Sequence, residues 1–239
     1  MNIPIIVTSC INPNAPLTKL QDPKIRIDVT IDALKKICKH ADNIVFCDGS
    51  AFDISAELKK HPEFDNKNIE VLFFKNDTKS VEMFGKGFGE GEIVNYAVEH
   101  SEYIHSSTCF AKLTSKLYVD NLQKCLKAFN STGFFVPVPS FREEMIDTRF
   151  YIVDKNFYNK NLKKVYKKVR DLEGIYLEHV FYDVLIKLDK HKYVARVMPI
   201  IRGVSGTFNT NYSSDNKMKY FIKTLRLKYL SIFSNSKEK

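Results

Sequence analysis

The sequence predicts an α/β fold, with a mainly parallel sheet flanked by helices in a single domain. Three times before residue 101, a short apolar segment is followed by a helical pattern, an alternation that is typical of strand–helix–strand crossovers. The chain has 239 residues, of which 44% are hydrophobic, and this is enough to bury one sizeable core. No linker or low-complexity segment divides the chain, and it shows no internal repeat.

The first half of the chain has the most regular pattern. Strands are expected at residues 3–9, 43–47 and 69–74, and helices at residues 26–40 and 52–60. Thr8 and Ser9 close the first strand, and Asp48 follows the second. Because ligands bind at the carboxyl ends of parallel strands, these three side chains are predicted to line a binding site.

The second half is less regular. Strands are expected at residues 110–119, 134–138, 148–153 and 193–201, helices at residues 161–170 and 176–188, and a glycine-containing loop at residues 202–207. Lys112, Thr114 and Lys116 alternate with apolar residues, so they are expected on one face of a strand. The alternative is that they form the solvated face of an edge strand.

Residues 85–101 hold the densest glycine cluster of the chain. Four glycines alternate with other residues, and apolar residues at helical spacing follow. This pattern predicts a glycine loop that feeds a helix N-terminus, where backbone N–H groups can hold a phosphate or a sugar hydroxyl. Acids in the expected first turn favour hydroxyls; the alternative is a surface loop before an ordinary helix. The predicted ligand-binding residues are Gly85, Lys86, Gly87, Gly89, Glu90 and Glu92.

The composition narrows the partners and the compartment. A net charge of +9 favours anionic partners such as nucleotide phosphates, anionic lipid or nucleic acid. The five cysteines form no C-x-x-C pair, so neither a zinc site nor a disulfide framework is expected. No apolar run has the length of a membrane span, and the first residues lack a signal-peptide pattern. These features predict a cytoplasmic protein with reduced cysteines.

Residues 213–239 are expected to form a basic, amphipathic C-terminal helix. Between residues 216 and 233, lysines and one arginine are interleaved with aromatic and leucine residues, a composition that is typical of helices at a membrane interface. The helix is expected to contact the inner face of an anionic membrane. The alternative is a helix docked on its own domain with a solvated basic face.

In their order along the chain, these motifs resemble those of GT-A-like, nucleotide-sugar-dependent glycosyltransferases of bacterial capsule and lipopolysaccharide gene clusters. IIVTSCINP and IVFCDGS resemble their first two strands, and GKGFGEGEIVNYAVEHS and FAKLTSKLYV resemble a glycine-rich helix opening and a lysine-bearing strand of one small branch. DTRFYIV, YLEHVFYDVL and GVSGTF follow in the expected order. The resemblance covers residues 1–212 and implies a nucleotide-binding half at 1–105 and an acceptor half at 106–212.

The resemblance implies a transferase that moves a sugar from a nucleotide-sugar donor to a lipid-linked or growing polysaccharide acceptor. Glu178 is expected to take the proton of the acceptor hydroxyl, with Asp147 and His179 as rivals; the alternative for Glu178 is an exposed helix residue. The alternative for Asp48 and for the 202–207 loop is an ordinary turn. The alternative for the arginines is a plain salt bridge. The implied donor-binding residues outside the glycine stretch are Thr8, Ser9, Asp48, Lys112, Thr114, Lys116, Arg149, Arg202 and Ser205.

One motif of the resembled enzymes is missing. Most of them hold Mn²⁺ or Mg²⁺ with an Asp-x-Asp pair, which this sequence lacks. Lys112 and Lys116 stand where the pair would be sought, and lysines can neutralise a leaving phosphate as a cation does. The sequence therefore predicts an enzyme without a divalent metal or another cofactor.

Two other functions stay open. One is a sugar nucleotidyltransferase; the other is a protein without transferase activity that binds nucleic acid or an anionic surface. Nucleic acid is not an expected partner, because no binding motif accompanies the dispersed lysines.

Overall fold

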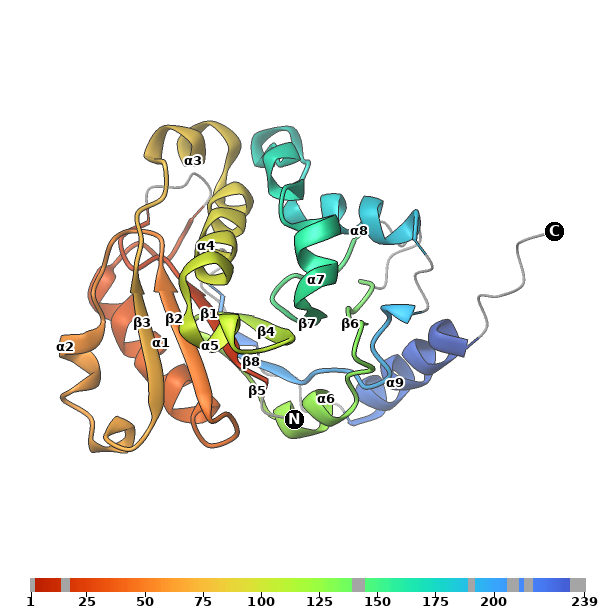
Figure 1. Cartoon of the computed structure of the whole chain (residues 1–239), viewed down its shortest axis with the longest axis horizontal. Helices are drawn as coiled ribbons and strands as arrows, with labels where there is room; N and C mark the ends of the chain where they lie inside the picture. The colour runs from red at the N-terminus through yellow and green to blue at the C-terminus, as the bar shows by residue number, and fades with distance from the viewer. Residues whose placement is uncertain are drawn as a thin grey trace.

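The computed structural model describes residues 3–13, 18–138, 145–188, 192–205, 211–212 and 217–232. Its central sheet has six strands in the order β3-β2-β1-β4-β7-β6, with helices on both faces (Figure 1). The strands are β1 (Ile5–Ser9), β2 (Asn43–Asp48), β3 (Asn68–Phe73), β4 (Cys109–Thr114), β6 (Gly133–Phe134) and β7 (Phe150–Asp154). β1 to β4 are parallel, and β6 and β7 form an antiparallel edge. The predicted α/β fold is confirmed.

The register of the sheet brings the ends of three strands together. Ser9 at the end of β1 pairs with Asp48 of β2, and Thr8 pairs with Thr114 of β4. These carboxyl ends form the edge at which open α/β sheets bind ligands.

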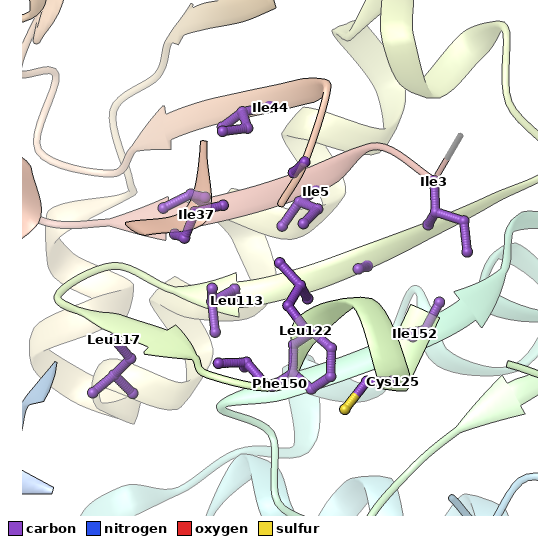
Figure 2. Close-up of a cluster of buried hydrophobic side chains, with 14 of the residues drawn as sticks. Ile3, Ile5, Ile37, Ile44, Leu113, Leu117, Leu122, Cys125, Phe150 and Ile152 are labelled. Atoms are coloured by element: carbon purple, nitrogen blue, oxygen red, sulfur yellow. The ribbon is translucent and has the colours of Figure 1, made fainter. Parts of the chain in front are cut away.

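Alternation along β1 assigns the two faces of the sheet. Ile5 and Val7 pack with α1 (Pro23–Ile37), α2 (Ser55–Leu58) and α6 (Leu122–Lys127), a cluster that Figure 2 shows around Ile37 and Leu122. Ile6 packs on the other face with α4 (Lys86–His100) and α8 (Leu177–Ile186). The shorter helices are α3 (Thr78–Phe84), α5 (Glu102–His105) and α7 (Lys155–Phe157), and single turns lie at Pro62–Phe64, Tyr158–Leu162, Val165–Lys168 and Asp171–Glu173.

The glycine loop predicted at residues 85–91 is wrong, because α4 already begins at Lys86. Of the four glycines in this stretch, only Gly85, between α3 and α4, has a positive φ, of 101°. The helical glycines serve close packing: a Cβ at Gly91 would lie 2.1 Å from Tyr166 Cβ, and one at Gly89 would lie 2.9 Å from Val81 Cγ2. The glycines let α4 approach its neighbours, and the acids expected in its first turn lie further along the helix.

The single strand predicted at residues 110–119 is divided into β4 and β5 (Leu117–Val119) by a turn. Lys116 in this turn has a φ of 69°, which ends the extended path. β5 joins a second, antiparallel sheet with β8 (Ile201–Val204) and β9 (Asn211–Tyr212). The prediction that Lys112 and Lys116 lie on one face of the same strand is therefore wrong.

Other predicted elements also differ from the structure: the strand predicted at residues 134–138 is limited to β6, and the helix predicted at residues 52–60 is limited to α2. No regular helix covers residues 161–170, where short turns follow α7 instead. The strand predicted at residues 193–201 is wrong: β8 begins only at Ile201 and uses residues expected to form a loop. Residues 206 and 207 of that loop lie outside the described residues.

Within the C-terminal helix predicted at residues 213–239, the structure describes α9 (Lys217–Ile232); residues 213–216 and 233–239 lie outside the described residues. Leu227 is buried in the core cluster shared with α1 and α6, so the helix is docked along one side. None of the described helices is long and apolar enough to cross a membrane. The predicted boundaries at residues 105 and 212 stay predictions.

Candidate functional site

A cleft of about 780 Å³ opens at the carboxyl ends of β1 and β4, with α4 and α8 contributing to its walls. This volume is in the range of small-molecule sites in proteins. The predicted residues that line it are Thr8, Ser9, Lys86, Gly87, Gly89, Glu90, Thr114, Lys116, Asp147, Arg149, Glu178 and Ser205. The predicted residues that do not line it are Asp48, Gly85, Glu92, Lys112, His179 and Arg202.

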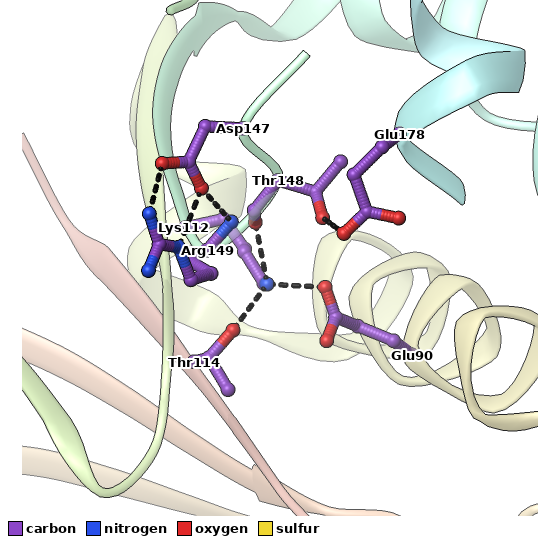
Figure 3. Close-up of polar contacts among 7 residues, drawn as sticks. All are labelled: Glu90, Lys112, Thr114, Asp147, Thr148, Arg149 and Glu178. Atoms are coloured by element: carbon purple, nitrogen blue, oxygen red, sulfur yellow. Dashed lines mark hydrogen bonds and ion pairs between the residues drawn. The ribbon is translucent and has the colours of Figure 1, made fainter. Parts of the chain in front are cut away.

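Lys112 is a buried tie behind the cleft wall (Figure 3). Its Nζ forms an ion pair with Glu90 and donates to Thr114 Oγ1 and to the Thr148 carbonyl, both at 2.8 Å. An ammonium has three N–H donors, and these three acceptors use all of them. The structure therefore assigns Lys112 to holding α4, β4 and the Thr148 segment together.

Glu178, at the start of α8, is a partly buried carboxyl that lines the cleft. Its Oε1 accepts a hydrogen bond of 2.9 Å from Thr148 Oγ1, as Figure 3 shows. Burial, reinforced by the nearby negative charges of Glu90 and Asp147, raises the pKa of Glu178 above its ordinary value. A carboxylate with a raised pKa is a stronger base, and these properties are those of an acid–base catalyst.

The two rivals of Glu178 have other partners. Asp147 accepts from Arg149 Nε at 2.8 Å and from Arg149 Nη2 at 2.6 Å, and the guanidinium lies 4.8 Å from the centre of the Tyr212 ring. His179 Nδ1 accepts from the backbone N–H of Tyr176 at 3.1 Å, which caps α8. Asp147 is thus neutralised by its pair, and His179, which does not line the cleft itself, has a structural role as a helix cap.

The floor of the cleft, formed by Thr8, Ser9 and Lys116, has polar groups that the chain itself leaves unsatisfied. Thr8 Oγ1 and Ser9 Oγ are buried and have no hydrogen-bond partner among the described residues. Lys116 Nζ donates to Ser115 Oγ at 3.1 Å. Burial, and next the positive charge of Arg26, lower the pKa of Lys116 to about 7. A bound anion would offset both effects, so this floor is suited to an anionic ligand.

The N-terminus of α4 is already occupied by a carboxylate of the chain. Asp171 Oδ2 accepts from the backbone N–H of Gly87 at 3.0 Å. Burial raises the pKa of Asp171, while the Gly87 N–H opposes that rise. The sequence predicted that this helix start holds a phosphate or a sugar hydroxyl, but in the structure the Asp171 carboxylate occupies that position.

Asp48 and Glu92 are structural acceptors. The Asp48 carboxylate accepts from the backbone N–H groups of Ile11 and Ser50, both at 2.8 Å, and from the Ser50 hydroxyl. It thereby fixes the loops that follow β1 and β2. Glu92 accepts from Asn76 Nδ2 at 2.8 Å, and Arg202 forms an ion pair with Asp120 beside β5.

Most enzymes of the resembled class hold a divalent metal with Asp-x-Asp, whereas two of the described carboxylates of this cleft already have cationic partners from the chain. Glu90 is paired with Lys112, and Asp147 is paired with Arg149. Within the part of the chain that the structure describes, no three His, Cys, Asp or Glu residues form a group that could hold a metal ion. Metal independence itself stays a prediction.

Sequence reasoning missed several lining residues, among them Arg26, Asn76, Thr148 and Asp171. Asn76 had a usable signal, since it follows the third predicted strand at the ligand edge. Asp171 had no such signal, because it lies in a short turn far along the sequence and reaches Gly87 only through the tertiary fold. Arg26 reads as an ordinary basic helix residue, although it is buried and its Nε donates to the Cys10 carbonyl at 2.7 Å.

No protein-family profile matches the chain, and no curated protein sequence matches it. Among solved structures, it is similar to a putative nucleotide-diphospho-sugar transferase from Desulfovibrio desulfuricans, with 13% identity, 81% of this chain and 77% of the other covered, and a TM-score of 0.47. It is also similar to the WbbM bifunctional glycosyltransferase, with 11% identity, 94% of this chain and 44% of the other covered, and a TM-score of 0.49. A third similar structure is 4-diphosphocytidyl-2C-methyl-D-erythritol synthase from Anaerococcus prevotii, with 12% identity, 94% of this chain and 97% of the other covered, and a TM-score of 0.47.

Proposed function

We propose that the chain is a glycosyltransferase that moves a sugar from a nucleoside diphosphate sugar to a glycan acceptor in this cleft. The observation that carries the proposal is that one cleft holds two unlike groups. The floor has Lys116 and two buried hydroxyls without a partner among the described residues, whereas the α8 wall has Glu178, a partly buried carboxyl with a raised pKa. Sugar transfer needs positive charge at the leaving phosphates and a base at the acceptor hydroxyl.

The donor is proposed to lie with its nucleotide against the carboxyl end of β1. Thr8 and Ser9 would supply hydroxyls to its polar groups, and Lys116 would meet the diphosphate. A protonated Lys116 beside a dianionic group regains the electrostatic stabilisation that it loses on burial. Lys86 also lines this part of the cleft and adds a second positive charge.

The transfer is proposed to be a single displacement. The acceptor oxygen bonds to the anomeric carbon, while the bond from that carbon to the phosphate oxygen breaks and its electron pair leaves with the nucleoside diphosphate. The proton of the acceptor hydroxyl passes to the Glu178 carboxylate. Thr148 fixes this carboxylate by its 2.9 Å hydrogen bond, and Lys112 fixes Thr148 through its carbonyl.

The acceptor is proposed to be a lipid-linked or growing surface polysaccharide, and the enzyme to work without a divalent metal at the inner face of the cell membrane. The basic helix α9 and the order of the sequence motifs support this placement. The engaged carboxylates of the cleft support metal independence.

A thermal-shift screen against UDP-, GDP-, CMP- and dTDP-sugars tests the proposal, because a ligand that binds only the folded state raises its stability. At least one nucleotide sugar is expected to raise the melting temperature and to release its nucleoside diphosphate when glycan acceptors are added. Pyrophosphate release from a nucleoside triphosphate and a sugar phosphate would instead identify a nucleotidyltransferase. Salt-sensitive DNA or heparin binding without any nucleotide-sugar effect would favour a nucleic-acid-binding protein.

A further inference from the structure

Helix α9 has an exposed apolar stripe, formed by Met218, Phe221, Ile222, Leu225 and Tyr229. These side chains are between 48% and 67% exposed. They recur at steps of one, three or four residues, so they share one face of the helix. Large apolar groups gathered in this way on an exposed helix indicate a surface that a partner covers.

The opposite face of α9 is fixed to the protein. Leu227 is 1% exposed, and Leu230 packs against the same core cluster. The Tyr220 hydroxyl accepts a hydrogen bond of 3.3 Å from Asn121 Nδ2. The stripe is therefore presented by an anchored helix, and Figure 1 shows α9 at the periphery of the molecule, away from α2 and β3.

Positive charge accompanies the stripe. Lys223 and Lys228 are exposed on α9; helical spacing places Lys228 beside Leu225 at the edge of the stripe, and Lys223 nearer the docked face, in line with Leu227. The sequence of the helix, residues 217–232, contains no Asp or Glu. An apolar face on a helix whose charged residues are all basic complements a bilayer whose surface is anionic, because the apolar groups enter the acyl boundary while the long lysine side chains reach the headgroups.

We propose that the exposed face of α9 docks on an anionic lipid bilayer. The helix would lie in the interface plane and would not cross the membrane, since it has 16 residues, several of them basic. Tyr212, which lines the cleft, precedes α9 by a short segment. Docking would bring the cleft close to a lipid-linked acceptor, and this link rests on the proposed function. Vesicle binding itself requires neither a donor nor catalysis.

Co-sedimentation of the full chain with phosphatidylcholine vesicles, with and without phosphatidylglycerol, tests the docking. The wild-type chain is expected to bind the anionic vesicles, and F221S/L225S is expected to weaken this binding by roughly tenfold or more, because the inserted apolar area is lost. K223E/K228E is expected to remove the preference for anionic vesicles. F73S and K79E, which alter an exposed Phe on β3 and an exposed Lys on α3, are the matched controls and are expected to bind like the wild type.

Circular dichroism and melting curves first establish that each variant is folded. Equal binding by the wild type and F221S/L225S, or no binding of the wild type to anionic vesicles, would overturn the proposal. A concentration-dependent dimer that F221S/L225S abolishes would assign the stripe to a second copy of the chain instead. Vesicle binding without any response to nucleotide sugars would leave the docking intact while it removes the transferase, so the two failures are distinguishable.

Discussion

The start of α4 and the floor both line the cleft, but they differ in whether the chain itself provides partners for their polar groups. At the start of α4, the backbone N–H of Gly87 is paired with Asp171, and Asn76 bridges the Gly89 carbonyl and Glu92. On the floor, Thr8 Oγ1 and Ser9 Oγ have no partner among the described residues. Because unpaired buried polar groups are costly, the floor is the region where a ligand would gain most.

The glycine-rich stretch therefore looks like a ligand loop in sequence but is built for packing. The floor, whose Thr8, Ser9 and Lys116 the sequence also marked as binding residues, keeps that role open, and burial lowers the pKa of its Lys116 to about 7. If this contrast is right, changes at the two regions must separate stability from ligand binding and turnover.

The largest expected effect is on turnover, for Glu178→Gln. Losing a positioned base is expected to lower kcat by roughly 10²–10⁴-fold, while the melting temperature and nucleotide-sugar affinity change little. Because the pKa of Glu178 is raised, wild-type kcat should rise with pH through that value, and the variant should lose this rise. Glu173→Gln, at an exposed turn, is the control, and a fully active Glu178→Gln would remove Glu178 from the chemistry.

Lys112→Met separates a structural lysine from a ligand-binding one. It leaves the Glu90 carboxylate and the buried Thr148 carbonyl without their donor, so the free energy of unfolding is expected to fall by about 1–3 kcal/mol. Urea denaturation measures this change. A variant of unchanged stability with weakened nucleotide binding would show that Lys112 acts on the donor directly.

Gly91→Ala tests the packing of α4. Its new Cβ would lie 2.1 Å from Tyr166 Cβ, and overpacking of this kind costs about 1–3 kcal/mol. Gly89→Ala is the milder partner, since the closest atom, at 2.9 Å, is the Val81 Cγ2 methyl. If both variants keep full stability and lose only ligand affinity, the stretch is a ligand loop after all.

Chelation is expected to have no effect. Lys116 and Lys86 supply the positive charge that a divalent ion would otherwise bring, so transfer in the presence of EDTA should match the untreated rate. Activity that EDTA abolishes and Mn²⁺ restores would mean that the cleft carboxylates leave their present partners to bind metal.

The sequence predicted the sheet correctly because hydrophobic alternation and strand–helix order are local signals. It placed most of the predicted site residues at the correct edge for the same reason, since the carboxyl ends of β1 and β4 follow from topology alone. It could not separate Lys112 from Lys116: the two share one sequence pattern, and only the left-handed turn at Lys116 sends them to different environments. Nor could it find Asp171, whose role depends on a contact with Gly87 across 84 residues.

The central claim is that the cleft floor binds the phosphates of a nucleotide sugar, and calorimetry on Lys116→Met tests it most directly. The probe is the nucleotide sugar that most stabilises the wild-type chain, titrated at pH values below and above 7, with Arg202→Met as the control outside the cleft. Because the pKa of Lys116 is lowered to about 7, an anion should bind its protonated form. Wild-type affinity should therefore fall as the pH rises past that value, with proton uptake on binding.

Lys116→Met is expected to bind at least about tenfold more weakly, which corresponds to about 1.4 kcal/mol, and to lose the pH dependence, whereas Arg202→Met should bind like the wild type. A folded Lys116→Met variant with wild-type affinity and wild-type pH dependence would contradict the assignment of the floor to the donor phosphates.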